Sequence, residues 1–431
     1  MEILAFLTSL AIVLIVGLLL SILSKKINLP DTLLLILGGM ALSFVYYNGS
    51  PILSFPIMFL IGISFIALLM IVFDSASRLK LVEVNNFSDE VFKLALLFLL
   101  FNLVFLTFIT HKMFSIQNVY LSLIFSVLMA GTAPDVILPQ LRGLRYNAVE
   151  ILKLESIVNT PLTVLLPFIL IDLMRSNLDV VSRFMQAFGP LLQQFITGIG
   201  AGVIIGFLIF KIMGESYSTI YSPLGLIIAA LLAYVLAENL GGNGVLAVAI
   251  FGLVFANSAI KNKFTLLHFE SELAVFMNIL VFTLIGLYIA PPLSAAFFLK
   301  ALVLFAAYLL IRFASVAVVF RKSGYDLKEQ VFMTLATPKG ISVAVVAFTL
   351  MNFNNPSGEA FIPGIAPILS LTLVFMLYSI ITSSITAKFA KSFLKPPKKS
   401  KESVLSKTLE NLASKIPEKK KVSGKTLSGK K

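Results

Sequence analysis

Long apolar runs constrain this chain more than any other feature of its sequence. Near-continuous runs of about 17–25 apolar residues recur between Leu4 and Phe389, and each is long enough to cross roughly 30 Å of hydrocarbon as an α-helix. Since 58% of the residues are hydrophobic and only 13% are charged, the composition suits a lipid bilayer rather than water. Strands of a membrane barrel would alternate apolar and polar residues over about ten positions, so we predict an all-α membrane protein.

Charges, prolines and glycines divide the apolar runs into separate segments. The predicted segments lie at residues 3–23, 31–47, 52–73, 92–110, 117–138, 151–174, 191–210, 222–237, 245–257, 272–290, 294–320, 329–351 and 363–387. We therefore expect about 13 transmembrane helices, with ends placed to within a few residues. They form one transmembrane domain over residues 1–394, and a basic tail over residues 395–431 follows it.

Lys and Arg are unevenly distributed between the two sets of loops. If the N-terminus lies outside, the loops that follow odd-numbered segments contain 13 of these residues. The opposite loops contain only Lys112, Arg175 and Arg183. Because positive residues accumulate on the cytoplasmic side, we expect a multi-pass protein of the cell membrane with its N-terminus outside and its C-terminus in the cytoplasm.

Most of the net charge of +13 belongs to the tail, where 12 Lys and 3 Glu give +9. Anionic lipid headgroups account for a Lys-rich segment beside a membrane, so we expect membrane lipid as a partner and no nucleic acid. With no Cys and only two His, Cys-ligated metal sites are excluded and His-based metal chemistry is disfavoured. No Gly-x-Ser-x-Gly elbow occurs either. We expect no cofactor and no enzymatic activity.

Two of the predicted helices are interrupted at corresponding places. Residues 129–135 and 335–340 each combine Thr, Pro and a charge in mid-membrane, and both contain Gly. Proline removes an amide donor and clashes with the preceding turn, while glycine relaxes the backbone, so such segments unwind. Paired interrupted helices in two halves of a membrane protein indicate the midplane binding site of a transporter.

Charges in the middle of a membrane helix cost about 2.5–3.5 kcal/mol each and need a reason. We place Asp135, Glu155, Arg312 and Lys339 at this depth. Asp135 and Lys339 suit a structural role, in which they neutralise the half-helix ends of the unwound segments. Asp135 has a second interpretation, because a carboxylate in low dielectric favours a bound proton and can exchange it for a cation.

The sixth segment carries a further cluster of oxygen-bearing side chains. Glu155 and Asn159 are spaced i, i+4 and share one helix face, with Ser156 beside them. A carboxylate, a hydroxyl and an amide carbonyl are the hard oxygen ligands that Na⁺ or Li⁺ accepts in place of water. Glu155 has a second interpretation as the partner of Arg312 in a buried ion pair that joins the sixth and eleventh helices.

At these positions the chain resembles the NhaP-type branch of the monovalent cation:proton antiporters. That family has Thr-Asp-Pro in a broken fifth helix, Glu-Ser-x-x-Asn-Asp in the sixth, a buried Arg in the eleventh and Arg-Gly in a broken twelfth. The matching residues here are Thr132, Pro134, Glu155, Ser156, Asn159, Arg312 and Gly340. Residues 240–247 and 282–287 also resemble family segments. The resemblance implies an inverted-repeat fold with two broken crossing helices, a homodimer, and exchange of a monovalent cation, expected to be Na⁺, for protons.

Three departures from the family pattern bear on mechanism. Ala133 stands where the family has Asp, with Asp135 two residues later, and Lys339 replaces Arg. Thr160 occupies the position of the family Asp that carries the ion, and a threonine hydroxyl can ligate a cation but cannot release a proton near neutral pH. The candidate cation and proton site therefore comprises Thr132, Asp135, Glu155, Ser156, Asn159 and Thr160, with Arg312 and Lys339 as structural charges.

Two other functional interpretations stay open from the sequence. Loss of the family Asp at Thr160 is compatible with a degenerate, non-transporting relative that acts as a membrane sensor or partner subunit. Retention of Glu155, Ser156, Asn159 and Arg312 favours a working antiporter instead. A different solute carrier or a channel-like leak is the third interpretation.

Overall fold

The computed structural model describes residues 2–47, 50–77, 81–133, 136–137, 141, 146–175, 180–215, 221–258, 262–289, 291–354 and 361–394. The predicted tail over 395–431 and the candidate residue Asp135 lie outside the described residues.

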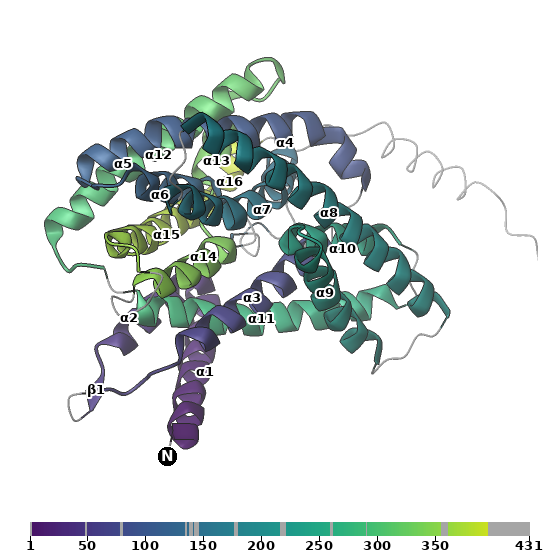
Figure 1. The fold of residues 1–431 in the computed structure, drawn as a ribbon, viewed down its shortest axis with the longest axis horizontal. Helices are drawn as coiled ribbons and strands as arrows, with labels where there is room; N and C mark the ends of the chain where they lie inside the picture. The colour runs from purple at the N-terminus through teal and green to yellow at the C-terminus, as the bar shows by residue number, and fades with distance from the viewer. Residues whose placement is uncertain are drawn as a thin grey trace, which may run out of the picture.

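The described chain is helical apart from one short hairpin (Figure 1). The helices are α1 (Glu2–Ile27), α2 (Asp31–Ser43), α3 (Ile57–Ala76), α4 (Leu81–Phe101), α5 (Thr107–Met113), α6 (Val119–Ala130), α7 (Asn147–Arg175), α8 (Val180–Glu215), α9 (Tyr221–Asn239), α10 (Gly244–Asn257), α11 (Lys263–Tyr288), α12 (Ala295–Val319), α13 (Leu327–Leu335), α14 (Ile341–Met351), α15 (Ile365–Lys388) and α16 (Ala390–Phe393). The π-helical turn η1 (Asn102–Leu106) joins α4 to α5, and 3₁₀ turns η4 (Phe320–Lys322) and η5 (Asn352–Asn354) follow α12 and α14. Strands β1 (Tyr46–Tyr47) and β2 (Ser50–Pro51) pair antiparallel.

The predicted all-α membrane architecture is confirmed. Within the described residues, nine helices are long and apolar enough to cross a membrane, and α2, α6, α10 and α14 are shorter apolar helices. Each predicted segment coincides with one of these helices, and α13 joins α14 within the twelfth. The number of complete crossings stays a prediction, because the short helices do not span about 30 Å by themselves.

The interruption predicted in the twelfth segment lies between α13 and α14, at residues 336–340. In the fifth segment, predicted over 117–138, the α-helix ends at Ala130. The tenth segment begins earlier than its predicted start at residue 272. Helix α11 starts at Lys263 and is continuous through Lys263, His268 and Glu270, which precede that predicted start.

The helices form two groups that meet at α14. Figure 1 shows α1, α2, α3 and α11 in the lower part of the view, and α4, α5, α6, α7, α12 and α13 in the upper part. Helix α14 packs against α3 and α11 on one side and against α7 and α15 on the other. Apolar side chains of α3, α11, α14 and α15 share one buried cluster.

Small residues allow the backbones of α2 and α11 to approach closely. A Cβ on Gly39 would lie 2.0 Å from the carbonyl oxygen of Thr283, and a Cβ on Gly286 would lie 2.1 Å from the carbonyl oxygen of Ile36. Any larger residue would push the two helices apart. Close contact through small residues is how helices associate in lipid, where burial of apolar surface gives no advantage.

Candidate functional site

The two interrupted segments cross and bond to each other. Gly131 follows α6 in an extended conformation, and the amide of Ala133 donates to the carbonyl oxygen of Pro338 at 2.9 Å. A Cβ built on Gly340 would lie 2.2 Å from the Cβ of Ala133. The crossing therefore has two unwound backbones in contact, with glycine at the point of closest approach.

This contact predicts a specific steric effect. Gly340→Ala forces the two segments apart, and we expect a loss of about 1–3 kcal/mol in the free energy of unfolding, as for other overpacked interiors. Gly225→Ala in α9 is the matched control, because a Cβ there meets nothing within 4 Å. Thermal unfolding of both purified variants in detergent measures the difference, and equal melting temperatures would contradict the crossing geometry.

Lys339 lies in one interrupted segment and bonds to the backbone of the other. Its side chain is fully buried, and its Nζ donates to the carbonyl oxygens of Met129 at 2.6 Å and Gly131 at 2.8 Å. A third bond of 2.6 Å reaches the hydroxyl of Tyr308. An ammonium has three hydrogens to donate, and the carbonyl end of a helix carries partial negative charge. Lys339 therefore lies where it neutralises the carboxyl end of α6.

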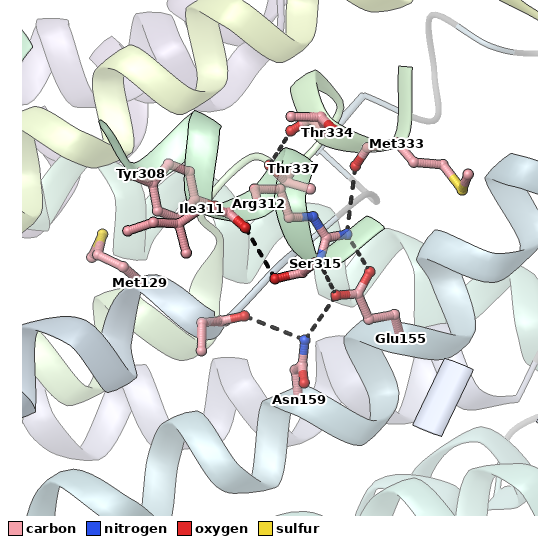
Figure 2. Close-up of polar contacts among 12 residues, drawn as sticks. Met129, Glu155, Asn159, Tyr308, Ile311, Arg312, Ser315, Met333, Thr334 and Thr337 are labelled. Atoms are coloured by element: carbon pink, nitrogen blue, oxygen red, sulfur yellow. Dashed lines mark hydrogen bonds and ion pairs between the residues drawn. The ribbon is translucent and has the colours of Figure 1, made fainter. Parts of the chain in front are cut away.

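The predicted buried ion pair between Glu155 and Arg312 is confirmed. Both side chains are fully buried, and the guanidinium of Arg312 donates to Oε1 of Glu155 at 2.5 Å and to Oε2 at 2.6 Å (Figure 2). The guanidinium also lies 4.6 Å from the ring centroid of Phe98 and donates to the Met333 carbonyl oxygen at 3.5 Å. This bidentate pair joins α7 to α12, next to the end of α13.

Asn159 connects the ion pair to the crossing. Its side-chain amide donates to Oε1 of Glu155 at 3.2 Å and to the carbonyl oxygen of Ala130, the last residue of α6, at 3.3 Å (Figure 2). Both amide hydrogens are therefore used within the protein, and its carbonyl oxygen is the atom that can accept. The i, i+4 relation predicted from the sequence places Glu155 and Asn159 together on one face of α7.

The two candidate hydroxyls of α7, those of Ser156 and Thr160, donate their hydrogens to carbonyl oxygens of their own helix. Ser156 donates to the carbonyl oxygen of Lys153 at 2.8 Å, and Thr160 donates to the carbonyl oxygen of Ser156 at 2.7 Å. Bonds of this kind leave oxygen lone pairs for a cation. Ser156 is buried and Thr160 is partly exposed, so the two oxygens lie at different distances from solvent.

Thr132 is the remaining described candidate in the unwound segment after α6. Its side chain is 2% exposed, and its hydroxyl has no hydrogen-bond partner within the described residues. Its role as a ligand stays a prediction, as does that of Asp135. Across the described part of the chain, no group of three or more His, Asp or Glu side chains could hold a metal ion.

Sequence reasoning missed several residues that complete the site. The centroid of the Tyr308 ring lies 4.6 Å from Lys339 Nζ. Tyr308 precedes Arg312 by one helical turn on α12, so the face that it shares with Arg312 could have marked it as a site residue in the sequence. Ser379 accepts the backbone amide of Lys339 at 3.0 Å, and no sequence signal marked it. Outside the crossing, sequence reasoning also left out Glu270, a fully buried acid on α11.

Two interrupted helices that cross within a bundle of apolar helices are the architecture of a multi-pass membrane transporter. The chain belongs to the sodium/hydrogen exchanger family, because the family model described as sodium/hydrogen exchanger, transmembrane, matches residues 10–391.

Named relatives and solved structures agree with this membership. The chain is 27% identical over 365 residues to probable Na⁺/H⁺ antiporter 2 of Methanocaldococcus jannaschii, covering 80% of this chain and 85% of that protein. It is 24% identical over 373 residues to Na⁺/H⁺ antiporter 1 of the same organism, covering 81% and 84%. The structure of the sodium proton antiporter MjNhaP1 from that organism at pH 8 superposes with a TM-score of 0.76 at 19% identity, covering 91% of this chain and 98% of that one. The predicted antiporter fold is thereby confirmed.

Proposed function

We propose that this protein is a secondary antiporter that exchanges Na⁺ for protons across the cell membrane. The observation that carries the proposal is the crossing itself: a buried carboxylate, an amide and hydroxyl oxygens lie beside two unwound backbones that Lys339 stabilises. Membership of the exchanger family supports it, as do relatives named Na⁺/H⁺ antiporters. The non-transporting alternative has no observation in its favour beyond the threonine at position 160.

In this proposal the cation site is built at the crossing from Thr132, Asp135, Glu155, Ser156, Asn159 and Thr160. Glu155 contributes negative charge that Arg312 largely balances, while hydroxyl and amide oxygens replace water around the ion. Asp135 binds the proton that the cation displaces, because Thr160 has no acidic proton. Arg312 and Lys339 hold the two halves of the site together and do not carry the ion.

The proposal extends to assembly and orientation. The distribution of Lys and Arg supports an orientation with the N-terminus outside and the C-terminus in the cytoplasm. The Lys-rich tail binds anionic lipid at the cytoplasmic surface. By analogy with the family, the working form is a homodimer. Crosslinking of the protein in native membranes and protease access to tagged termini test these statements.

Transport by the purified protein in liposomes tests the central proposal. With a pH dye trapped inside, we expect a pulse of external Na⁺ to change luminal pH, because each entering cation drives proton exit. Successive pulses of Li⁺ and K⁺ then rank the cations. Protein-free liposomes set the leak, and an added Na⁺/H⁺ ionophore shows that the dye reports exchange. No response to any of the three cations, with the protein correctly folded and inserted, would favour the non-transporting alternative.

A further inference from the structure

A group of buried polar side chains lies between α6 and the segment that precedes it. Asn102 of η1, Thr110 of α5 and Ser122 of α6 are each fully buried. Within the described residues, neither the amide nitrogen nor the amide oxygen of Asn102 has a hydrogen-bond partner, and the hydroxyls of Thr110 and Ser122 have none. Buried polar groups are almost always hydrogen-bonded, because an unpaired one costs free energy. Three such residues on neighbouring segments therefore need a common explanation.

One hydrogen bond fixes how these segments face each other. The hydroxyl of Thr107, at the start of α5, donates to the hydroxyl of Ser126 on α6 at 2.9 Å, and both side chains are buried. The turn η1 and helix α5 both pack against α6, and Figure 1 shows α5 beside α6. Because only residues 114–118 separate α5 from α6, the two helices form an antiparallel hairpin.

On one side of this bond, the polar group reaches the crossing. In an antiparallel pair, a step backward along one helix matches a step forward along the other. Asn102 precedes the bonded Thr107 by five residues. It therefore lies near the level of Gly131, which follows Ser126 by five and whose carbonyl oxygen accepts from Lys339. Asn102 also begins η1, and π-helical turns occur frequently at functional sites.

On the other side, the polar group reaches the end of α5. Ser122 precedes Ser126 by four residues and so lies near the level of His111, the residue after Thr110. Nδ1 of His111 is buried and has no hydrogen-bond partner in the described part of the chain, although the residue as a whole is partly exposed. From Asn102 to His111 the segment advances by roughly 13 Å, at about 1.5 Å per residue.

The chemistry of these groups identifies their ligand as water. Asn102 needs an acceptor for its amide hydrogens and a donor for its amide oxygen, and hydroxyls also both donate and accept. A metal cation would leave the amide hydrogens of Asn102 unpaired. The sequences of η1, α5 and α6 contain no Asp or Glu to balance a cation, and a buried charge without a partner is costly. Water both donates and accepts, and a buried water typically makes about three hydrogen bonds.

We propose that Asn102, Thr110 and Ser122 hold a file of water molecules between η1, α5 and α6, and that this file carries protons between the crossing and the end of α5. The bonded hydroxyls of Thr107 and Ser126 bridge its two parts. Each oxygen along the file takes up one proton and releases another, so one O–H bond forms for each that breaks. The proton route rests on the proposed exchange function, whereas the binding of water does not.

X-ray radiolysis of the purified full-length protein in detergent tests the bound water. Hydroxyl radicals form where water is held and oxidise the side chains beside it. Leu106 of η1 and Leu284 of α11 are both fully buried, but only Leu106 belongs to a segment that borders the proposed file. We expect mass spectrometry of peptides to show oxidation of Leu106 and none of Leu284. Equal labelling of the two would overturn the binding of water.

Asn102→Leu separates a hydrated amide from a dry one, because leucine is similar in size and has no polar atoms. In a hydrated site the change breaks hydrogen bonds to water that leucine cannot replace, so we expect a lower melting temperature and loss of the label on Leu106. In a dry site the change would remove an unpaired buried group and raise the melting temperature. That result would contradict the proposal.

Two transport assays separate the proton route from a structural role. Thr110→Val replaces a hydroxyl by a methyl group at constant shape, so it should fold even if Asn102→Leu does not. We expect it to slow Na⁺/H⁺ exchange in liposomes several-fold and to leave exchange of radioactive for unlabelled Na⁺, which moves no proton, at the wild-type rate. Thr386→Val is the matched control, because Thr386 is buried on α15 and donates to its own helix at 2.8 Å, and it should match wild type in both assays.

The outcomes of these assays are distinct. Equal slowing of both exchanges in Thr110→Val would show a structural role, and unchanged Na⁺/H⁺ exchange would show that protons take another route, so either result would overturn the proton route. A wild-type protein that performs neither exchange would refute the proposed function and the proton route with it. The radiolytic labelling of Leu106 would still decide whether water is bound.

Discussion

Arg312→Met is expected to destabilise the protein by about 3–5 kcal/mol, because it strands the carboxylate of Glu155 without its partner. Both side chains are fully buried, and the two hydrogen bonds between them are 2.5 and 2.6 Å long. Methionine fills a similar volume but supplies neither charge nor donors. Thermal or denaturant unfolding of the purified protein in detergent measures the loss.

Two controls isolate the stranded charge. The double variant Glu155→Gln with Arg312→Met removes both charges and should regain much of the stability lost by Arg312→Met alone, since replacing a whole buried pair costs far less than breaking it. Lys93→Met breaks the exposed pair with Asp89, whose side chains are 64% and 80% exposed, and should change little. If Arg312→Met and Lys93→Met lowered the free energy of unfolding by the same amount, the pair of Glu155 and Arg312 would not stabilise the fold more than an exposed pair does.

Asp135→Asn is expected to reduce proton-coupled exchange to the level of protein-free liposomes while the protein still folds. Thr160 cannot release a proton, and the second candidate acid, Glu155, accepts two bonds from Arg312 and one from Asn159. All three bonds use the carboxylate oxygens of Glu155 as acceptors, so Glu155 is already engaged as the structural partner of Arg312. Among the residues proposed at the crossing, Asp135 is therefore the one that takes the proton. Luminal pH during Na⁺ pulses measures the loss, with melting temperature as the check on folding.

Thr160→Asp is the complementary change. It adds a titratable ligand one turn after Ser156 on α7, and we expect it to raise activity or to shift its dependence on pH. Full pH-dependent exchange in Asp135→Asn would disprove the assignment of the proton to Asp135. A wild-type protein without exchange, together with exchange gained in Thr160→Asp, would show a degenerate transporter whose coupling acid had been lost.

Local patterns in the sequence were sufficient for part of the site. The spacing of Glu155 and Asn159 fixed their common face, because an α-helix repeats every 3.6 residues. The prolines and glycines of residues 129–135 and 335–340 predicted unwinding, and the described helices α6, α13 and α14 end or begin there. The pairing of Glu155 with Arg312 was also predictable, since two deep opposite charges in lipid have few other ways to be compensated.

Other contacts could not be deduced from spacing. Lys339 bonds to Met129 across 210 positions of the chain, and Ser379 accepts the Lys339 amide across 40. Ser379 is one of many small polar residues in the membrane helices, so nothing in its neighbourhood marked it. The start predicted for the tenth helix, at residue 272, left Glu270 outside the membrane, because charged residues were taken as breaks between apolar segments.

The sequence by itself determined the class of protein, because a bilayer accepts only segments that satisfy their backbone bonds internally, and apolar runs of helical length meet that requirement wherever they occur. The tertiary structure alone decided which charges meet. A helix of ionisable and apolar residues can bury Glu270 and leave Glu272 exposed, or the reverse, and only the packing of α11 against its neighbours selects which side chain is buried. Partners that bond across the fold are chosen by the positions of whole helices, which no local pattern encodes.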